Sequence, residues 1–215
     1  MPVLLCHLYE KVYRSYRTLG GLCGYKKNAP EILRRQIRKA PKGNIMISSV
    51  TDPYQPMEGQ YELTRQCLEI LAPHPFSLSI LTKSPLVLRD MDLLKKFEDH
   101  EVGLTITTDD EEIRKIFEPN APPVEARIQA LKRLHENGIH TYAFIGPLLP
   151  MNPEALAEKI KPYVHHVWID RMNYVSRTLK IYKSMRLAQW LEDDFTDPII
   201  YRLQQGFTGK DIRLC

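Results

Sequence analysis

The stretch SSVTDPYQP, which begins at Ser48, places two serines, a threonine and an aspartate directly after an apolar segment. A short turn between a strand and a helix needs only one capping side chain, which raises the question of what the other polar groups do. Pro53 disfavours the helical conformation for Asp52. The residues alone leave two roles open for the Asp52 carboxylate, which can cap the following helix or bind hydroxyl groups.

A lysine, Lys83, closes the apolar segment SLSILTK. Its ammonium can meet a carboxylate or phosphate as a point charge, its amine can form a Schiff base when desolvated, or the side chain can extend into water. Thr105 and Thr107 lie at the end of the apolar segment VGLTITT. Arg127 follows the turn EPNAPP on a predicted helix, where an arginine ordinarily faces solvent.

These residues lie at the ends of short apolar segments that alternate with helical patterns. The patterns predict strands at 44–50, 77–83, 102–108, 140–150 and 165–173. They predict helices at 61–71, 124–137 and 153–163, with another opening at Asp90. This alternation indicates an α/β fold with a parallel sheet, either a barrel or doubly wound. In both architectures the chemistry gathers at the carboxyl ends of the strands.

The composition is that of an ordinary globular protein, with 215 residues, 43% hydrophobic residues and a net charge of +4. Ten basic residues between Lys11 and Lys42 are opposed only by Glu31, so this stretch either meets nucleic-acid phosphates or forms a solvated face. The apolar runs are shorter than the roughly 18 residues of a membrane span, and the start lacks signal-peptide features. We therefore expect a cytoplasmic protein without a membrane partner.

Metal-ligand spacing is missing from the sequence. No C-x-x-C pair occurs among the four cysteines, which are Cys6, Cys23, Cys67 and Cys215. His165 and His166 are adjacent, so in a strand they point to opposite faces. We therefore predict no metal ligands among these residues.

Six motifs together resemble the radical S-adenosylmethionine (SAM) superfamily, and within it the spore photoproduct lyase-like branch, also described as DNA repair photolyase-like. In chain order they are KNAPEILRRQI, SSVTDPYQPMEGQYELTRQCLEIL, SILTKSPLVLRDMDLL, VGLTITTDDEEIRKIFEPNAPPVEARIQALKRLHENGI, FIGPLLP and VWIDRMN. The resemblance implies a partial (β/α)6 barrel of parallel strands. It also implies a [4Fe-4S] cluster that reductively cleaves SAM to a 5′-deoxyadenosyl radical, with electrons from a flavodoxin- or ferredoxin-type protein.

The resemblance also implies roles for the strand-end residues. By position, the SSVTD stretch holds the methionine amine and neighbouring groups of SAM, Lys83 holds the methionine carboxylate, and Thr105 or Thr107 contacts the ribose. The residues expected to bind the cofactor are Ser48, Ser49, Thr51, Asp52, Lys83, Thr105, Thr107 and Arg127. No catalytic residue and no substrate are assigned.

One departure from the family limits these expectations. The family's C-x-x-x-C-x-x-C motif, whose thiolates bind three irons of the cluster, does not occur in this sequence. We interpret Met1 as an internal methionine of a longer chain, so that the first strand and the cluster loop are missing. We expect residues 1–30 to form a lead-in, 31–178 a partial barrel and 179–215 an extension of two helices.

Three functions follow as alternatives. The first is a radical SAM enzyme of this branch that is inactive as given, because no cluster means no electron for SAM cleavage. The second is a remnant or binding module without a cluster or catalysis. The third is a barrel lyase that uses Lys83 as a Schiff-base amine. Nucleic-acid binding stays open, because the family's named member acts on DNA and residues 11–42 are basic.

Overall fold

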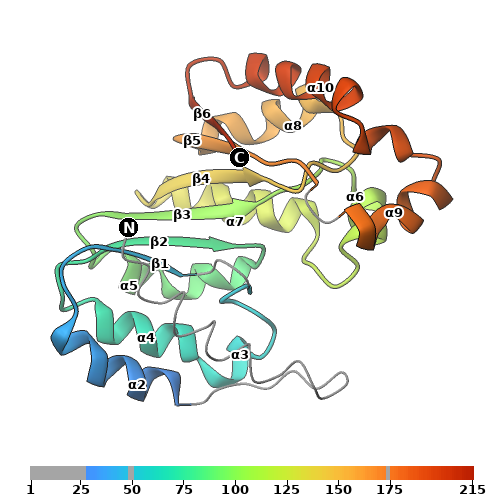
Figure 1. Ribbon diagram of the computed structural model, residues 1–215. Coiled ribbons are helices and arrows are strands. Elements are labelled where there is room, and N and C mark those ends of the chain that lie inside the picture. Colours follow the sequence, from blue (N-terminus) through green and yellow to red (C-terminus); the bar gives the residue numbers. More distant parts are fainter. Residues whose placement is uncertain (1–27, 48–50, 173–174) are drawn as a thin grey trace. The chain divides into compact units, whose positions relative to one another are not determined.

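The computed structural model describes residues 28–47, 51–172 and 175–215 (Figure 1). The chain divides into two compact units. The first unit comprises the chain up to Thr82 together with Leu86–Val102, and the second comprises Lys83–Pro85 together with Gly103–Cys215.

The first unit begins, in its described part, with a helical segment and a strand. Its elements are α2 (Ala29–Gln36), the 3-10 helix η2 (Ile37–Lys39), β1 (Asn44–Ile47), α3 (Glu58–Tyr61), α4 (Leu63–Leu71), β2 (Ser77–Thr82), most of the 3-10 helix η3 (Pro85–Asp90), α5 (Met91–Leu94) and the start of β3 (His100–Thr105). Strands β1 and β2 are parallel, with Asn44 opposite Ser77 and Ile47 opposite Ile80. Helix α2 packs against α4, and Leu68 and Leu71 on α4 are fully buried.

The helix predicted at 61–71 is interrupted at Glu62. This residue has a left-handed backbone (φ 51°), so α3 ends before it and α4 starts after it. The Glu58 carboxylate explains the restart, because its Oε1 accepts hydrogen bonds from the amides of Thr64 (2.9 Å) and Arg65 (3.3 Å). These amides belong to the first turn of α4 and have no partner within the helix, so a side chain from the preceding turn caps it.

The second unit contains the remaining strands and the longest helices. Its elements are the end of β3, α6 (Glu111–Phe117), α7 (Val124–Glu136), β4 (His140–Ile145), α8 (Pro153–Ile160), the 3-10 helix η4 (Lys161–Tyr163), β5 (His166–Ile169), α9 (Val175–Ser184), the 3-10 helix η5 (Ala188–Leu191), α10 (Asp193–Gly206) and β6 (Asp211–Leu214). Strand β5 pairs in parallel with both β4 and β6. Helix α10 packs against α8, and the two helices lie side by side in Figure 1.

The strands follow one another in the sheet in chain order, β1-β2-β3-β4-β5-β6. This order is the one that successive βα units of a parallel barrel produce. The predicted α/β fold with a partial barrel of six parallel strands is therefore confirmed. All five predicted strands are present, and the bounds of the strands differ from the prediction by a few residues where both lie within the described part of the chain.

The C-terminal segment differs from the expectation of two helices. Residues 179–215 contain helical segments, but they end in strand β6, whose Asp211 lies opposite His166 of β5. The four residues DIRL are too short and too polar to show a strand pattern in the sequence. Pairing with β5, rather than local propensity, makes this segment a strand.

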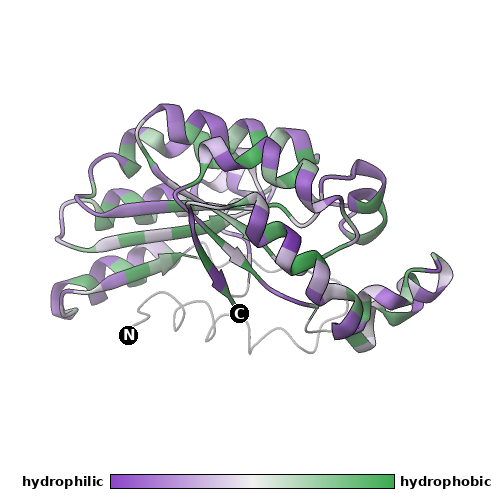
Figure 2. Ribbon diagram, turned by 90° about the horizontal axis from the view of Figure 1, so that it is seen from above, coloured by the Kyte–Doolittle hydropathy of each residue, from purple (hydrophilic) through white to green (hydrophobic). Residues whose placement is uncertain are grey.

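The helices carry hydrophobic and hydrophilic residues on different faces (Figure 2). On α7, Ile128, Leu131 and Leu134 are buried as the sequence pattern predicts. Gly138 has φ +78° one residue beyond the C-cap, which confirms its role in ending this helix. Among the described residues, none of the helices combines the length and the hydrophobicity needed to cross a membrane.

Candidate functional site

The turn after β1 is held by the carboxylate of Asp52. Its Oδ1 accepts a hydrogen bond from the Tyr54 amide at 2.9 Å and one from the Thr82 hydroxyl at 2.6 Å. These bonds join the turn to the last residue of β2, so they do not support the helix-capping alternative for Asp52. Thr51 is half-buried, whereas Ser48 and Ser49 lie outside the described residues.

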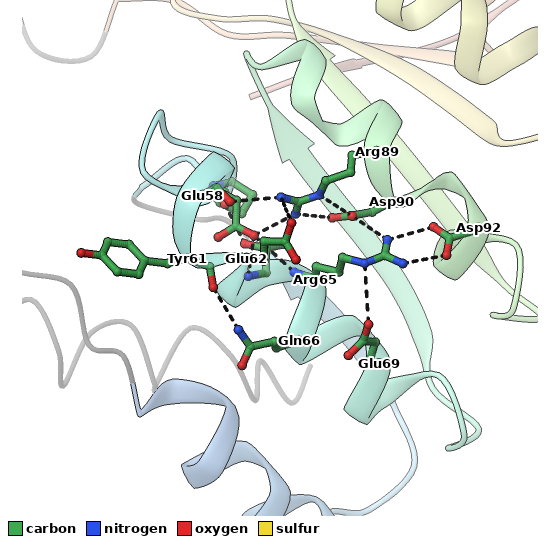
Figure 3. Close-up of polar contacts among 11 residues, drawn as sticks. Glu58, Tyr61, Glu62, Arg65, Gln66, Glu69, Arg89, Asp90 and Asp92 are labelled. Atoms are coloured by element: carbon green, nitrogen blue, oxygen red, sulfur yellow. Dashed lines mark hydrogen bonds and ion pairs between the residues drawn. The ribbon is translucent and has the colours of Figure 1, made fainter.

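The first unit also contains a network of ion pairs between two arginines and several carboxylates (Figure 3). The Arg89 guanidinium contacts the carboxylates of Glu58 at 2.9 Å and Asp90 at 2.7 Å. Arg65 reaches the same Asp90 at 3.0 Å and also Asp92 at 2.9 Å. The Asp90 side chain is fully buried, with 0% exposure, and two guanidinium groups compensate its charge.

Two residues connect the network to the turn. The Thr64 hydroxyl donates a 2.6 Å hydrogen bond to the carbonyl of Pro53, and the Thr64 amide donates to Glu58. The Tyr54 side chain is buried, and burial, reinforced by the negative charge of Asp90, raises its pKa well above the ordinary value. Residues 52–54 are thus held by hydrogen bonds from Thr82 of β2 and Thr64 of α4. Sequence reasoning did not identify Glu58, Arg89 or Asp90 as partners.

The second unit contains a cluster of two cations around one carboxylate. Glu118 lies 3.4 Å from the Lys83 ammonium and 2.8 Å from the Arg127 guanidinium. The Thr107 hydroxyl donates to the same carboxylate at 3.0 Å. The Glu118 side chain is 12% exposed and that of Lys83 is 35% exposed. Lys83 is therefore the cation of this cluster that a ligand can reach.

Arg127 does not lie at the surface, where a helix arginine ordinarily lies, because its exposure is 0%. Its guanidinium donates to the carbonyl of Pro122 at 2.9 Å and to that of Thr105 at 3.1 Å. Its Nη2 has no hydrogen-bond partner in the described part of the chain. These contacts make Arg127 a residue that fixes Glu118 and the end of β3.

Glu118 is the member of this cluster that the sequence pattern missed. Its loop is held by Arg114, whose Nη1 donates to the carbonyls of Glu118 (3.2 Å), Pro119 (3.3 Å) and Ala121 (3.1 Å). The sequence EPNAPP indicated only a turn before a helix. No local signal distinguishes this glutamate from a solvated one, because its partners Lys83 and Thr107 come from distant segments.

The sequence profile described as "Radical SAM superfamily" matches residues 6–161. The match covers well over half of the chain. The chain belongs to the radical SAM superfamily. The predicted family is thereby confirmed, although the match does not identify the branch.

Relatives and solved structures agree with this assignment. A protein of Methanocaldococcus jannaschii described as uncharacterized is 43% identical over 171 residues, which cover 78% of this chain and 64% of that protein. An uncharacterized protein of Acidianus two-tailed virus is 34% identical over 137 residues, covering 63% of this chain and 44% of that one. The chain therefore spans less than two thirds of the length of these relatives.

Two radical SAM enzymes share the fold at low sequence identity. Spore photoproduct lyase complexed with dinucleoside spore photoproduct aligns with a TM-score of 0.62 and 12% identity, over 86% of this chain and 67% of that one. SuiB of Streptococcus suis bound to S-adenosylmethionine aligns with a TM-score of 0.58 and 13% identity, over 91% of this chain and 44% of that one. At these identities the likeness shows the fold alone.

The cysteines of this chain do not fit the superfamily's iron–sulfur cluster. A cluster ligand must be a thiolate, whereas burial raises the pKa of Cys67 to about 12. Cys215, the other cysteine in the described part of the chain, is exposed, and none of the four cysteines has the spacing of the cluster motif. No chemical step can therefore be assigned through a cluster held by these residues.

Proposed function

We propose that this chain provides the SAM-binding residues of a spore photoproduct lyase-like radical SAM enzyme. The observation that carries the proposal is Lys83, whose partly exposed ammonium lies at the end of β2 and is oriented by Glu118 at 3.4 Å. By its place among the motifs that resemble the family, Lys83 corresponds to the family lysine for the methionine carboxylate of SAM, and a lysine suits a carboxylate as a point charge.

The other predicted residues fit this role to different degrees. By the resemblance, Asp52 provides a carboxylate for the methionine amine, and within the first unit this carboxylate accepts a hydrogen bond from Thr82. The Thr107 hydroxyl is committed to Glu118, so Thr105 is the more suitable of the two threonines for a ribose hydroxyl. Arg127 acts through Glu118 and Thr105, because its guanidinium contacts these residues.

When it is bound to a [4Fe-4S] cluster, SAM supplies a 5′-deoxyadenosyl radical by reductive cleavage. The proposed residues of this chain hold SAM for that step, whereas the given sequence does not contain the cysteine motif for the cluster. We therefore propose that the chain binds SAM without cleaving it, which corresponds to the alternative of a binding module. After iron–sulfur reconstitution, the chain should form no 5′-deoxyadenosine. Formation of this product would contradict the proposal.

The central experiment is calorimetric titration of the chain with SAM. Because Lys83→Ala removes a charge-assisted contact of about 1.5–3 kcal/mol, we expect SAM affinity to fall roughly 10- to 100-fold. Lys115→Ala is the matched control, because Lys115 is an exposed lysine of the same unit that pairs only with Glu112 among its described contacts. The proposal fails if SAM does not bind, or if Lys83→Ala binds it as tightly as the unaltered chain.

The Schiff-base alternative has less support from the structure. A Schiff-base lysine needs its nitrogen available to a carbonyl carbon, whereas the Lys83 nitrogen lies 3.4 Å from the Glu118 carboxylate. Borohydride trapping with a small aldehyde tests this alternative, and covalent capture that Lys83→Ala abolishes would revive it. DNA binding and the flavodoxin- or ferredoxin-type electron donor are proposals by resemblance.

A further inference from the structure

Histidines gather at the amino ends of β4 and β5 in the second unit. His140 opens β4 and His166 opens β5. The two strands are parallel, and Tyr142 is the register partner of His166. Because side chains alternate along a strand, the side chains of His140, Tyr142 and His166 lie on one face of the sheet.

This register brings two imidazole nitrogens close together. A ring nitrogen of His140 and one of His166 lie within 4.8 Å of each other. Two nitrogens that bind one tetrahedral Zn²⁺ at about 2.0–2.1 Å lie about 3.3 Å apart. His140 is exposed at the start of its strand and His166 is buried, so a small shift of the His140 ring would bring the two nitrogens to the distance that one ion requires.

Neighbouring rings orient both imidazoles. The Tyr142 ring stacks on His166, with centroids 4.7 Å apart and an interplanar angle of 10°. His165 stacks on His140 at 4.1 Å and 23°. The Nδ1 of His165 accepts a hydrogen bond from the Thr141 amide at 3.0 Å, which commits this nitrogen and fixes the ring. Such support from surrounding residues is typical of metal-binding histidines.

The glycine at position 103 shows how closely Tyr142 is packed. A Cβ atom at Gly103 would lie 2.2 Å from the Tyr142 ring, so only glycine leaves room for the ring that stacks on His166. The pair is therefore oriented by the tertiary structure and is not a chance approach of two surface side chains. Because His140 and His166 lie 26 positions apart in the sequence, rules based on short ligand spacing do not identify this pair.

We propose that His140 and His166 bind a divalent transition-metal ion such as Zn²⁺, with water or another oxygen donor completing the coordination. Imidazole nitrogen prefers ions of this class, whereas Mg²⁺ prefers oxygen ligands. The site is independent of the proposed SAM-binding function. The ion would join β4 to β5 and so stabilise the folded chain.

The test is a titration of the full chain with Zn²⁺, followed by calorimetry and by the shift in Tm. We expect His140→Ala to weaken Zn²⁺ binding at least tenfold and to abolish the rise in Tm, while Mg²⁺ has no effect on Tm. His135→Ala is the matched control. The ring centroid of His135 lies 5.2 Å from that of His165, but His135 is not one of the two proposed ligands. The His135→Ala variant should bind Zn²⁺ with an affinity within about twofold of that of the unaltered chain.

Three outcomes would overturn the proposal. These are a lack of Zn²⁺ binding, equal affinity in His140→Ala, and an equal loss in His135→Ala, which would indicate a general histidine-rich surface. Since metal binding requires neutral imidazoles, affinity must also fall as pH drops below the ordinary histidine pKa of about 6.5. His166→Gln provides a second variant, and its loss of Zn²⁺ affinity should match that of His140→Ala.

Discussion

The Asp52 carboxylate accepts a 2.6 Å hydrogen bond from the Thr82 hydroxyl, which joins the turn after β1 to the last residue of β2. The Tyr54 amide donates to the same carboxylate oxygen at 2.9 Å. The Asp52 carboxylate is therefore held in place without a ligand. Such preorganisation reduces the ordering cost of binding.

Asp52→Asn separates the charge of this residue from its structural contacts. An asparagine Oδ1 can accept both hydrogen bonds, so we expect stability to change by less than about 0.5 kcal/mol. SAM affinity should nevertheless fall several-fold, because the methionine amine loses its counter-charge. Calorimetry and thermal melting measure the two effects. Asp52→Ala, which loses both bonds, should also lower stability, and unchanged SAM affinity in Asp52→Asn would exclude Asp52 as an amine ligand.

Arg127→Met tests the cluster of the second unit. Removing one partner of a buried ion pair costs about 3–5 kcal/mol, and here Glu118 would keep its charge at 12% exposure beside Lys83 alone. Urea unfolding should show a loss of this size. Arg133→Ala on the exposed face of the same helix should change stability by less than about 0.5 kcal/mol. Equal effects of the two variants would show that Arg127 is not an essential counter-ion.

The predictable parts of the fold are those that hydrophobic periodicity encodes. The pattern of α7 gave the buried positions Ile128, Leu131 and Leu134, and Gly138 gave its end. The interruption at Glu62 could not be predicted, because it depends on the Glu58 carboxylate reaching the amide of Thr64. Strand β6 depends in the same way on its pairing with β5.

The site residues at the strand ends were predictable from the sequence, whereas the residues that hold them through tertiary contacts were not. Asp52 and Lys83 stand at the ends of apolar segments, where parallel sheets place their chemistry. Glu118 and Arg127 lie in a loop and a helix, and their burial results from contacts with Lys83, Thr105 and Thr107 across the tertiary structure. An arginine that neutralises an inward-facing glutamate has the same sequence signature as one that faces water.

Asp90 and Asp92 form a matched pair for testing the network of the first unit. Both contact Arg65, but Asp90 has 0% exposure and also binds Arg89, whereas Asp92 is 56% exposed. We expect Asp90→Ala to cost roughly 3 kcal/mol, because two partly buried guanidinium groups lose the buried carboxylate that they share. Asp92→Ala should cost less than about 1 kcal/mol, as exposed pairs do. Chemical denaturation distinguishes the two, and similar losses would mean that burial does not decide the strength of this network.

Cys67 gives the protein a specific sensitivity to alkaline pH. Burial, reinforced by the negative charge of Glu58, raises the pKa of this thiol from 9.0 to about 12. Above pH 9 the unfolded chain therefore releases a proton that the folded chain retains. Because the unfolded state then binds fewer protons, the free energy of unfolding falls as pH rises from 9 towards 12, by up to about 1.4 kcal/mol per pH unit.

Substituting this thiol should flatten the alkaline loss of stability. Tyr182, whose pKa is raised to about 12 by burial, and Tyr54 add their own losses, but only above the ordinary tyrosine pKa of about 10. Burial also raises the pKa of the Cys215 thiol, so both thiols lower stability between pH 9 and 10, and the difference between the unaltered chain and Cys67→Ala reports on Cys67. Urea unfolding of Cys67→Ala over this interval should show a smaller slope of stability against pH, whatever cost the lost side chain adds at neutral pH. Parallel slopes for the two chains would show that the thiol ionises in the folded protein as readily as in the unfolded one.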